Sequence, residues 1–284
     1  MIKCISYWST PNGLSHAEPI YSALKLSKDA GFEGIELCLG TPAPGSVLHT
    51  ESTQAECEAI RKQVDASGLK CETLAAGLTW GVNPTSNDKA VREQSIALHA
   101  AALERASWLG CQAMLMVPGV VNSPISPDEH VRYDHALERC REALKPLLET
   151  AERVGVDLCI ENVWNGMFYS PVEFRDFVDS FNHPRLGVYF DCGNVLGYHQ
   201  RPDHWIEILD KRIRRVHIKG YRESFGFDGT YSFCGLLDGD VPWPATMQAL
   251  KKIGYARTVV AEMLPFSEGL LEKTSSDMDQ LFAM

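Results

Sequence analysis

Short apolar runs alternate with longer segments of helical periodicity along the chain. A helical segment repeatedly ends at a glycine, and an apolar run begins within a few residues of it. Glycine after a last helical turn adopts the left-handed conformation that other residues adopt only under strain. This punctuation occurs at Gly31, Gly68, Gly110, Gly155 and Gly254. The apolar runs predict eight strands, at residues 3–8, 34–39, 70–76, 113–117, 157–163, 186–191, 213–219 and 257–263.

A helical segment follows each predicted strand, and this alternation is typical of a parallel sheet with right-handed crossovers. Eight such units suggest a closed (β/α)8 TIM barrel that spans residues 1–284 as one domain. The length of 284 residues agrees with this fold, which takes about 250 residues. An open doubly wound sheet is the alternative. We favour the barrel because no glycine-rich phosphate-binding motif follows the first strand.

Residues typical of helix starts precede several of the helical segments. Ser15 and Glu18 have the spacing of a capping box. Ser126 and Ser170 are each followed by a proline and then by a glutamate at the third position. These signals predict helices that begin just after the three serines. A further helix is predicted at residues 88–109 from the spacing of its apolar residues.

The overall charge narrows the range of partners. The net charge is −10, which argues against a nucleic acid as a partner, because nucleic-acid binding usually needs a basic surface.

The sequence also bears on the cellular location. No apolar run approaches the roughly 20 residues that span a membrane, and the start of the chain does not resemble a signal peptide. The nine cysteines form no C-x-x-C pair, which favours free thiols and a cytoplasmic location.

Each of the last four apolar runs carries a carboxylate or a histidine at or near its end: Glu161, Asp191, His217 and Glu262. A charge inside an apolar run is costly unless it is paired or binds a metal. Singly, each is more often a helix cap, an ion-pair partner or a hydrogen-bonded core residue. In a barrel, however, the carboxyl ends of neighbouring strands meet at one rim. Three carboxylates and one imidazole there would suit one divalent cation, with manganese or cobalt favoured over calcium or magnesium and zinc possible.

Four motifs resemble the xylose-isomerase-like sugar isomerase and epimerase superfamily. They are CIENVWN (159–165), GVYFDCGNVL (187–196), RVHIKGY (215–221) and the segment from GDVPWP to VVAEM (239–263). GFEGIEL (31–37) and residues 91–110 resemble it more generically. The resemblance implies a TIM barrel in which Glu161, Asp191, His217 and Glu262 bind one catalytic divalent metal, with manganese, cobalt or magnesium common. It also implies that Glu161 and Glu262 are the acid/base pair, and that the enzyme is a homo-oligomer.

The implied chemistry begins with removal of the proton next to a sugar carbonyl. The metal would hold the carbonyl and the neighbouring hydroxyl oxygen, and so stabilise the enediolate. Return of a proton to the opposite face gives epimerisation, and return to the adjacent carbon gives isomerisation. Two positions depart from the ketose 3-epimerases of the superfamily, which carry a histidine and a glutamate where this chain has Asn194 and Met167. Ketohexose specificity is therefore not carried over, and the substrate is expected to be a sugar or a sugar phosphate.

Further residues at or just past the predicted strand ends are candidates for contact with the substrate. Aromatic side chains suit the C–H faces of sugars as well as ordinary packing, and Lys219 and Arg222 could hold a phosphate or pair on the surface. The segment 222–240, rich in glycine and aromatic residues, is a candidate lid over the site. The candidate substrate-binding residues are Trp8, Glu36, Trp80, Trp164, Asn194, Lys219 and Arg222.

Three alternatives stay open. The same superfamily includes dehydratases of keto-inositols and keto-sugars, which start from the same enediolate. Its apurinic endonuclease branch uses three zinc ions and additional histidines, but the corresponding strand ends here, TLAAG (73–77) and MVPG (116–119), contain none. A non-catalytic sugar-binding protein is the third alternative, and the presence of all four metal ligands argues against it.

Overall fold

The computed structural model describes residues 1–123, 129–223 and 232–284. Eight parallel strands in these residues close into a barrel in the order β1-β10-β7-β6-β5-β4-β3-β2. Each overlaps one of the predicted apolar runs, so the prediction of a (β/α)8 barrel is confirmed. The strands are β1 Ile2–Ser6, β2 Gly34–Leu39, β3 Thr73–Ala76, β4 Ala113–Met116, β5 Asp157–Glu161, β6 Leu186–Asp191, β7 Ile213–Ile218 and β10 Thr258–Ala261.

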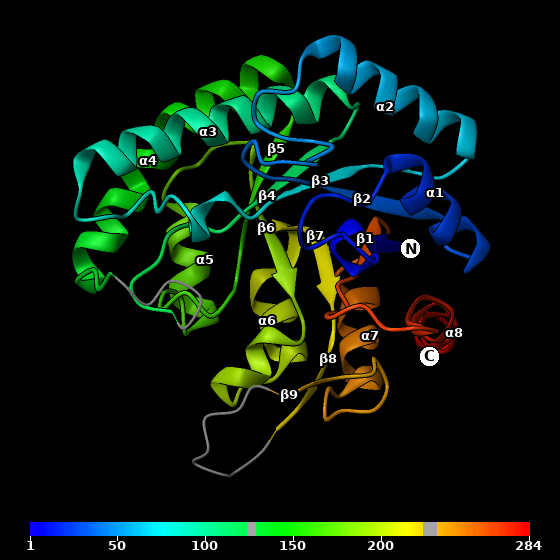
Figure 1. Cartoon of the computed structure of the whole chain (residues 1–284). Coiled ribbons are helices and arrows are strands. Elements are labelled where there is room, and N and C mark those ends of the chain that lie inside the picture. The colour runs from blue at the N-terminus through cyan, green and yellow to red at the C-terminus, as the bar shows by residue number, and fades with distance from the viewer. Residues whose placement is uncertain (124–128, 224–231) are drawn as a thin grey trace.

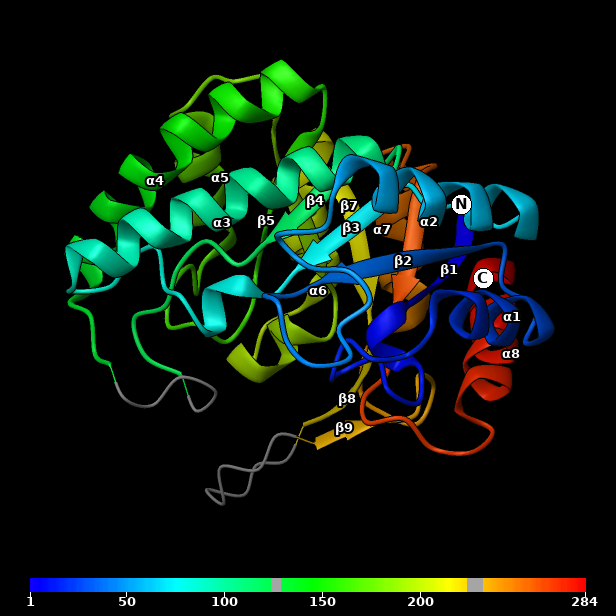
Figure 2. The same cartoon turned by 45° about the horizontal axis from the view of Figure 1, so that its top comes forward.

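An α-helix follows each barrel strand, and the helices surround the strands (Figures 1 and 2). After β7 the chain first forms a two-stranded antiparallel sheet, β8 Gly220–Arg222 and β9 Ser232–Cys234. Short 3₁₀ helices include η1 Tyr7–Ser9, η2 Leu78–Trp80, η3 Asn194–Tyr198 and η4 Asp210–Arg212. The α-helices are α1 Ile20–Asp29, α2 Gln54–Ser67, α3 Lys89–Trp108, α4 Tyr133–Val154, α5 Pro171–Asp179, α6 Pro202–Leu209, α7 Trp243–Lys252 and α8 Leu270–Ala283.

The helix ends agree with the glycine pattern. All five glycines that follow the helical segments have a positive φ, between 71° and 85°. At Gly155, the C-cap of α4, an added Cβ would meet no atom within 4 Å. Glycine is therefore needed there for its backbone conformation and not for space. The cysteines are all free thiols, as predicted.

The predicted helix starts are partly correct. Ser170 caps α5 through the Val172 amide, and α3 begins one residue after the predicted position 88. The capping box at Ser15 is wrong, because Ser15 and Glu18 both bond to Asn12 in a loop and α1 begins only after Pro19. Ser126 lies outside the described residues, and the helix that follows, α4, begins at Tyr133.

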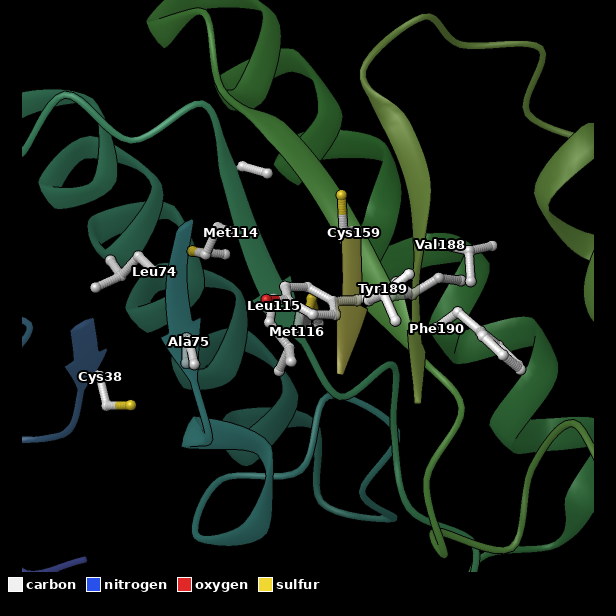
Figure 3. Packing of buried hydrophobic residues seen from close by; sticks show 14 of the residues in the cluster. Cys38, Leu74, Ala75, Met114, Leu115, Met116, Cys159, Val188, Tyr189 and Phe190 are labelled. Carbon is white, nitrogen blue, oxygen red and sulfur yellow. The ribbon is translucent and has the colours of Figure 1, made fainter. Parts of the chain in front are cut away.

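Alternating residues of β6 face opposite sides of the barrel wall, as in any strand. Figure 3 shows Tyr189 pointing away from its neighbours Val188 and Phe190. Phe190 packs outward against Trp205 of α6, whereas the Tyr189 hydroxyl donates to a carboxylate of β2. Asp191 is two residues after Tyr189 and so shares its inward side. Because side chains alternate along the strand, Asp191, the predicted metal ligand of β6, points into the barrel.

Candidate active site

The four predicted metal ligands lie at the carboxyl-terminal rim of four consecutive barrel strands. Glu161 ends β5, Asp191 ends β6, His217 is the next-to-last residue of β7, and Glu262 directly follows β10. Asp191 and His217 are fully buried, and Glu161 is 6% exposed. The interrupted apolar runs of the sequence are therefore neighbouring strands whose polar residues meet at one end of the barrel.

Three of these side chains converge closely. One ligand atom from each of Glu161, Asp191 and His217 lies within 4.8 Å of the others. His217 Nδ1 is buried without a hydrogen bond, 3.5 Å from Glu161 Oε1, whereas Asp191 Oδ2 lacks a hydrogen bond but lies 3.0 Å from the Lys219 ammonium. Buried polar atoms are normally satisfied, so the orphaned His217 Nδ1 beside two carboxylates indicates a missing partner. Two carboxylates and an imidazole are a donor set that fits a divalent cation such as manganese or cobalt.

A carboxylate from across the barrel fixes the His217 ring. Glu36 of β2 contacts His217 Nε2 through Oε1 at 2.8 Å, and its other oxygen accepts the Tyr189 hydroxyl hydrogen bond. All three side chains are fully buried. The bond at Nε2 leaves Nδ1 directed at Glu161 and Asp191. Such a carboxylate–histidine pair is the usual support behind a metal-binding imidazole.

Glu262 has a different partner in this structure. Its carboxylate accepts from Lys219 Nζ, and the same ammonium lies 3.0 Å from Asp191 Oδ2. Glu262 does not belong to the group of three whose atoms converge. Lys219 therefore bridges two of the four predicted ligands, and its positive charge occupies part of the space between them.

Burial and neighbouring charges shift the ionisation of the cluster. Burial raises the pKa of Glu161 to about 7, against the opposing effect of His217. Burial also raises the pKa of Asp191, against the effect of Lys219. Burial alone would lower the pKa of His217, but Glu36 and Glu161 raise it well above its usual value. Burial would raise the pKa of Glu262, yet Lys219 and His217 hold it below its usual range.

The loops after β5 and β6 hold Asp191 in place. Its Oδ1 accepts the Asn194 amide at 2.8 Å, and its own amide donates to Asn162 Oδ1 at 2.8 Å. Asn194 in turn donates to the Asn162 carbonyl at 3.0 Å. Asn194 is 1% exposed and lies beside the cluster. Asn194, which stands at the position of the histidine of the ketose 3-epimerases, therefore links the segments after β5 and β6 in this chain.

A cavity of about 630 Å³ lies over the cluster and is lined by Glu161, Lys219 and Glu262. Of the candidate substrate-binding residues, Glu36 and Arg222 are not part of its lining. Glu36 is buried behind His217, and Arg222 donates to the Asp238 carbonyl. The candidates that do line the cavity are Trp8, Trp80, Trp164, Asn194 and Lys219.

The candidate lid lies only in part within the described residues, because residues 224–231 fall outside them. After these residues, Phe233 of β9 lines the cavity and stacks on Trp164, with ring centroids 5.2 Å apart.

The sequence did not predict Phe233, Tyr189 or His16 as residues of the site. Tyr189 has the pattern of an ordinary core aromatic, and His16 lies in a loop before α1, where no periodicity marks it. His16 also lines the cavity.

Within the ranges described, none of the helices has the length and apolar character to cross a lipid bilayer.

Comparisons with known proteins show distant similarity over most of the chain. L-ribulose-5-phosphate 3-epimerase UlaE of Salmonella paratyphi A is 22% identical over 249 residues, covering 84% of this chain and 80% of that protein. An uncharacterized protein of Methanocaldococcus jannaschii is 25% identical over 188 residues, which are 64% of this chain and 60% of that protein.

The fold has solved counterparts. The crystal structure of D-psicose 3-epimerase from Clostridium cellulolyticum H10 superposes with a TM-score of 0.79 at 19% identity, covering 99% of this chain and 98% of that one. The profile of the family described as xylose isomerase-like TIM barrel matches residues 24–279. The resemblance seen in the sequence motifs is confirmed, and the chain belongs to the xylose isomerase-like TIM barrel family.

Proposed function

We propose that this chain is an enzyme acting on sugars, a divalent-metal-dependent epimerase or isomerase that moves a proton at the carbon next to a carbonyl. The observation that carries the proposal is the buried convergence of Glu161, Asp191 and His217, with Glu262 on the next strand. The relatives support the substrate class, because UlaE is named as a 3-epimerase of a sugar phosphate and the psicose enzyme as a 3-epimerase of a sugar.

Glu161, Asp191, His217 and Glu262 would hold the cation. When bound, a divalent ion supplies Lewis-acid polarisation of a carbonyl oxygen and offsets the negative charge that develops there. Manganese is our first choice among manganese, cobalt, magnesium and zinc, because the donor set mixes hard carboxylates with one imidazole.

Glu161 and Glu262 are the proposed proton-transfer residues. Both line the cavity, and they belong to strands separated in the barrel by β6 and β7. A sugar between them would present opposite faces of one carbon to two carboxylates. One glutamate would accept the proton and the other would return one, which inverts the carbon. Return of the proton to the adjacent carbon would give isomerisation instead.

The aromatic residues Trp8, Trp80 and Trp164 are proposed to pack against the C–H faces of the sugar. Asn194 and Lys219 are proposed as polar contacts at the same end of the cavity. Dehydration of a keto-sugar stays the alternative reaction. The described residues contain one metal-ligand group and not the larger histidine-rich set that a three-zinc endonuclease uses.

Proton exchange tests the proposal. Protein stripped of metal and reloaded with manganese would be incubated in heavy water with ketoses, ketose phosphates and keto-inositols, and the manganese removed before NMR. We expect metal-dependent deuterium at a carbon next to the carbonyl, together with an epimer or an isomer. An alkene product would identify the dehydratase. The absence of exchange on every compound, with metal bound, would contradict proton-transfer chemistry on this panel.

A further inference from the structure

Positive charge in the cavity is scarce and already paired. Among the described residues that line it, Lys219 is the one lysine or arginine, and its ammonium is shared between Asp191 and Glu262. His16 also lines the cavity, but burial lowers its pKa, so the ring is neutral near pH 7. A phosphate dianion needs charge-assisted donors that are free to bind it. The cavity therefore lacks the usual means of holding a sugar phosphate.

The places where barrels commonly bind phosphate offer one cation here, and it is already paired. Phosphate sites of TIM barrels often lie in the loops after the last two strands. In this chain the segments after β7 and β10 contribute Lys219, Phe233, Glu262 and Leu264 to the cavity, and Lys219 contacts Glu262 and Asp191. Arg222, the last residue of β8, donates a hydrogen bond to the Asp238 carbonyl at 2.9 Å and does not line the cavity. Residues 124–128 and 224–231 lie outside the described residues. Their sequences, PISPD and SFGFDGTY, contain no lysine, arginine or histidine.

The cavity is large for one sugar ring. Its volume is about 630 Å³. At about 30 Å³ for each liquid water, this volume corresponds to roughly twenty waters, whereas a hexose has about a dozen non-hydrogen atoms. A hexose held at Glu161 and Glu262 would therefore leave much of the space open. A second ring or a bulky substituent would fill the remainder.

The remaining wall suits an apolar or aromatic group. Trp164 is fixed by a hydrogen bond from Nε1 to the Asn194 carbonyl at 2.9 Å, and its ring lies nearly parallel to Phe233, at 14°. Trp8 and Trp80 line the same cavity from the short helices η1 and η2, which follow β1 and β3. Flat aromatic surfaces bind sugar C–H faces and aromatic aglycones, and they offer no counter-charge to an anion.

We infer that the substrate of this site is an uncharged glycoside, a keto-sugar that carries a second ring or an apolar aglycone, and not a sugar phosphate. The inference rests on the proposed function for the position of the reacting sugar. The sugar ring lies at Glu161 and Glu262, and its substituent packs against the stacked pair of Trp164 and Phe233.

Equilibrium binding tests this without requiring turnover. Manganese-loaded protein would be titrated with matched sets of a free sugar, its phosphate and its phenyl glycoside. Each set would be built on a 3-keto-aldose, such as 3-keto-glucose or 3-keto-galactose, because a glycosidic bond at C1 then leaves the carbonyl free. Calorimetry and tryptophan fluorescence would report binding. We expect at least one phenyl glycoside to bind about tenfold or more tightly than its parent sugar, and the phosphates to bind no better than the parents. A phosphate that binds most tightly overturns the inference, and so does the failure of every phenyl glycoside to exceed its parent.

A matched pair of variants localises the effect. Phe233 is 43% exposed, so Phe233→Ala removes one ring of the stacked pair without opening the core. We expect this variant to lose most of the preference for the phenyl glycoside and to keep its affinity for the parent sugar. Tyr21→Ala, at an exposed residue of α1 outside the cavity, is the control and should change neither. An unchanged preference in Phe233→Ala would contradict the assigned position of the substituent.

The two proposals fail in different ways. If proton exchange were absent while the glycoside preference and its dependence on Phe233 persisted, the catalytic proposal would fail and the binding inference would stand. If exchange occurred on a sugar phosphate with the tightest binding, the catalytic proposal would stand and the inference would fail.

Discussion

Glu36 holds His217 across the interior of the barrel. The two residues are 181 positions apart, yet Glu36 Oε1 and His217 Nε2 are 2.8 Å from each other, with both side chains fully buried. Their strands, β2 and β7, are separated in the barrel wall by β1 and β10, so the contact forms only because the sheet closes. Glu36 is thus a positioning residue that directs His217 Nδ1 toward Glu161 and Asp191.

Substitution Glu36→Gln should weaken metal binding without unfolding the protein. Loss of a carboxylate behind a metal-binding histidine typically costs about 10–100-fold in affinity. We expect a loss of this size for manganese, measured by calorimetry. The pKa of His217 should also fall, because Glu36 raises it. Tyr189→Phe should give a smaller loss, and Glu58→Gln, on the exposed side of α2, should give none. Unchanged affinity in Glu36→Gln would show that the contact does not support the metal site.

Metal affinity should increase with pH through the neutral range. Ligands bind a metal in their deprotonated form, so protons on them compete with the metal. The pKa of Glu161 is about 7 and that of His217 is well above its usual value, so both residues carry protons at about pH 6.5. We expect tighter manganese binding at about pH 8 than at about pH 6, with more protons released at the lower pH. Calorimetry in buffers of different ionisation enthalpy counts these protons. Equal affinity and no proton release at both pH values would contradict the assigned ligands.

Lys219 should compete with the metal. Its ammonium contacts Asp191 and Glu262, two of the proposed ligands. In Lys219→Met, two buried carboxylates lose their cation, and breaking a buried pair typically costs about 3–5 kcal/mol. We expect the metal-free variant to unfold at lower urea concentration and to gain more stability from manganese than the wild type. Lys252→Met, in an exposed ion pair with Glu207, is the control. A variant that gains less than the wild type would argue that Lys219 assists metal binding.

The glycine at the end of α4 provides a test of the fold. Gly155 has a φ of 76° and open space around its Cα. Gly155→Ala should lower the free energy of unfolding by about 1–2 kcal/mol, the usual cost of a left-handed non-glycine residue. Urea denaturation measures the change. A variant as stable as the wild type would mean that the backbone relaxes out of this conformation at little cost.

The sequence predicted features that depend on local pattern. The strands, the capped start of α5 at Ser170 and the positions of Glu161, Asp191, His217 and Glu262 all follow from residues close together in the chain. The capping box at Ser15 failed because Glu18 bonds to Asn12 within a loop, an arrangement that competes with helix formation.

Relationships across the barrel could not be predicted in the same way. From the sequence, Glu36 is a candidate for contact with the substrate, whereas its actual contact with His217 depends on the closure and register of the whole sheet. The pairing of Lys219 with Asp191 and Glu262 likewise depends on which side chains share the interior. Phe233 follows a glycine-rich segment without periodicity, so nothing local placed it against Trp164.

The most direct test of the central claim is proton exchange by single-glutamate variants. Once a substrate is known, Glu161→Gln and Glu262→Gln would each be loaded with manganese and compared with the wild type by NMR in heavy water. Product formation should fall at least about a hundredfold in each variant, the usual scale for loss of an acid/base group. Metal binding, measured in the same samples, should be retained in part. If either variant kept wild-type rates of exchange and product formation, the assignment of that glutamate to proton transfer would be wrong.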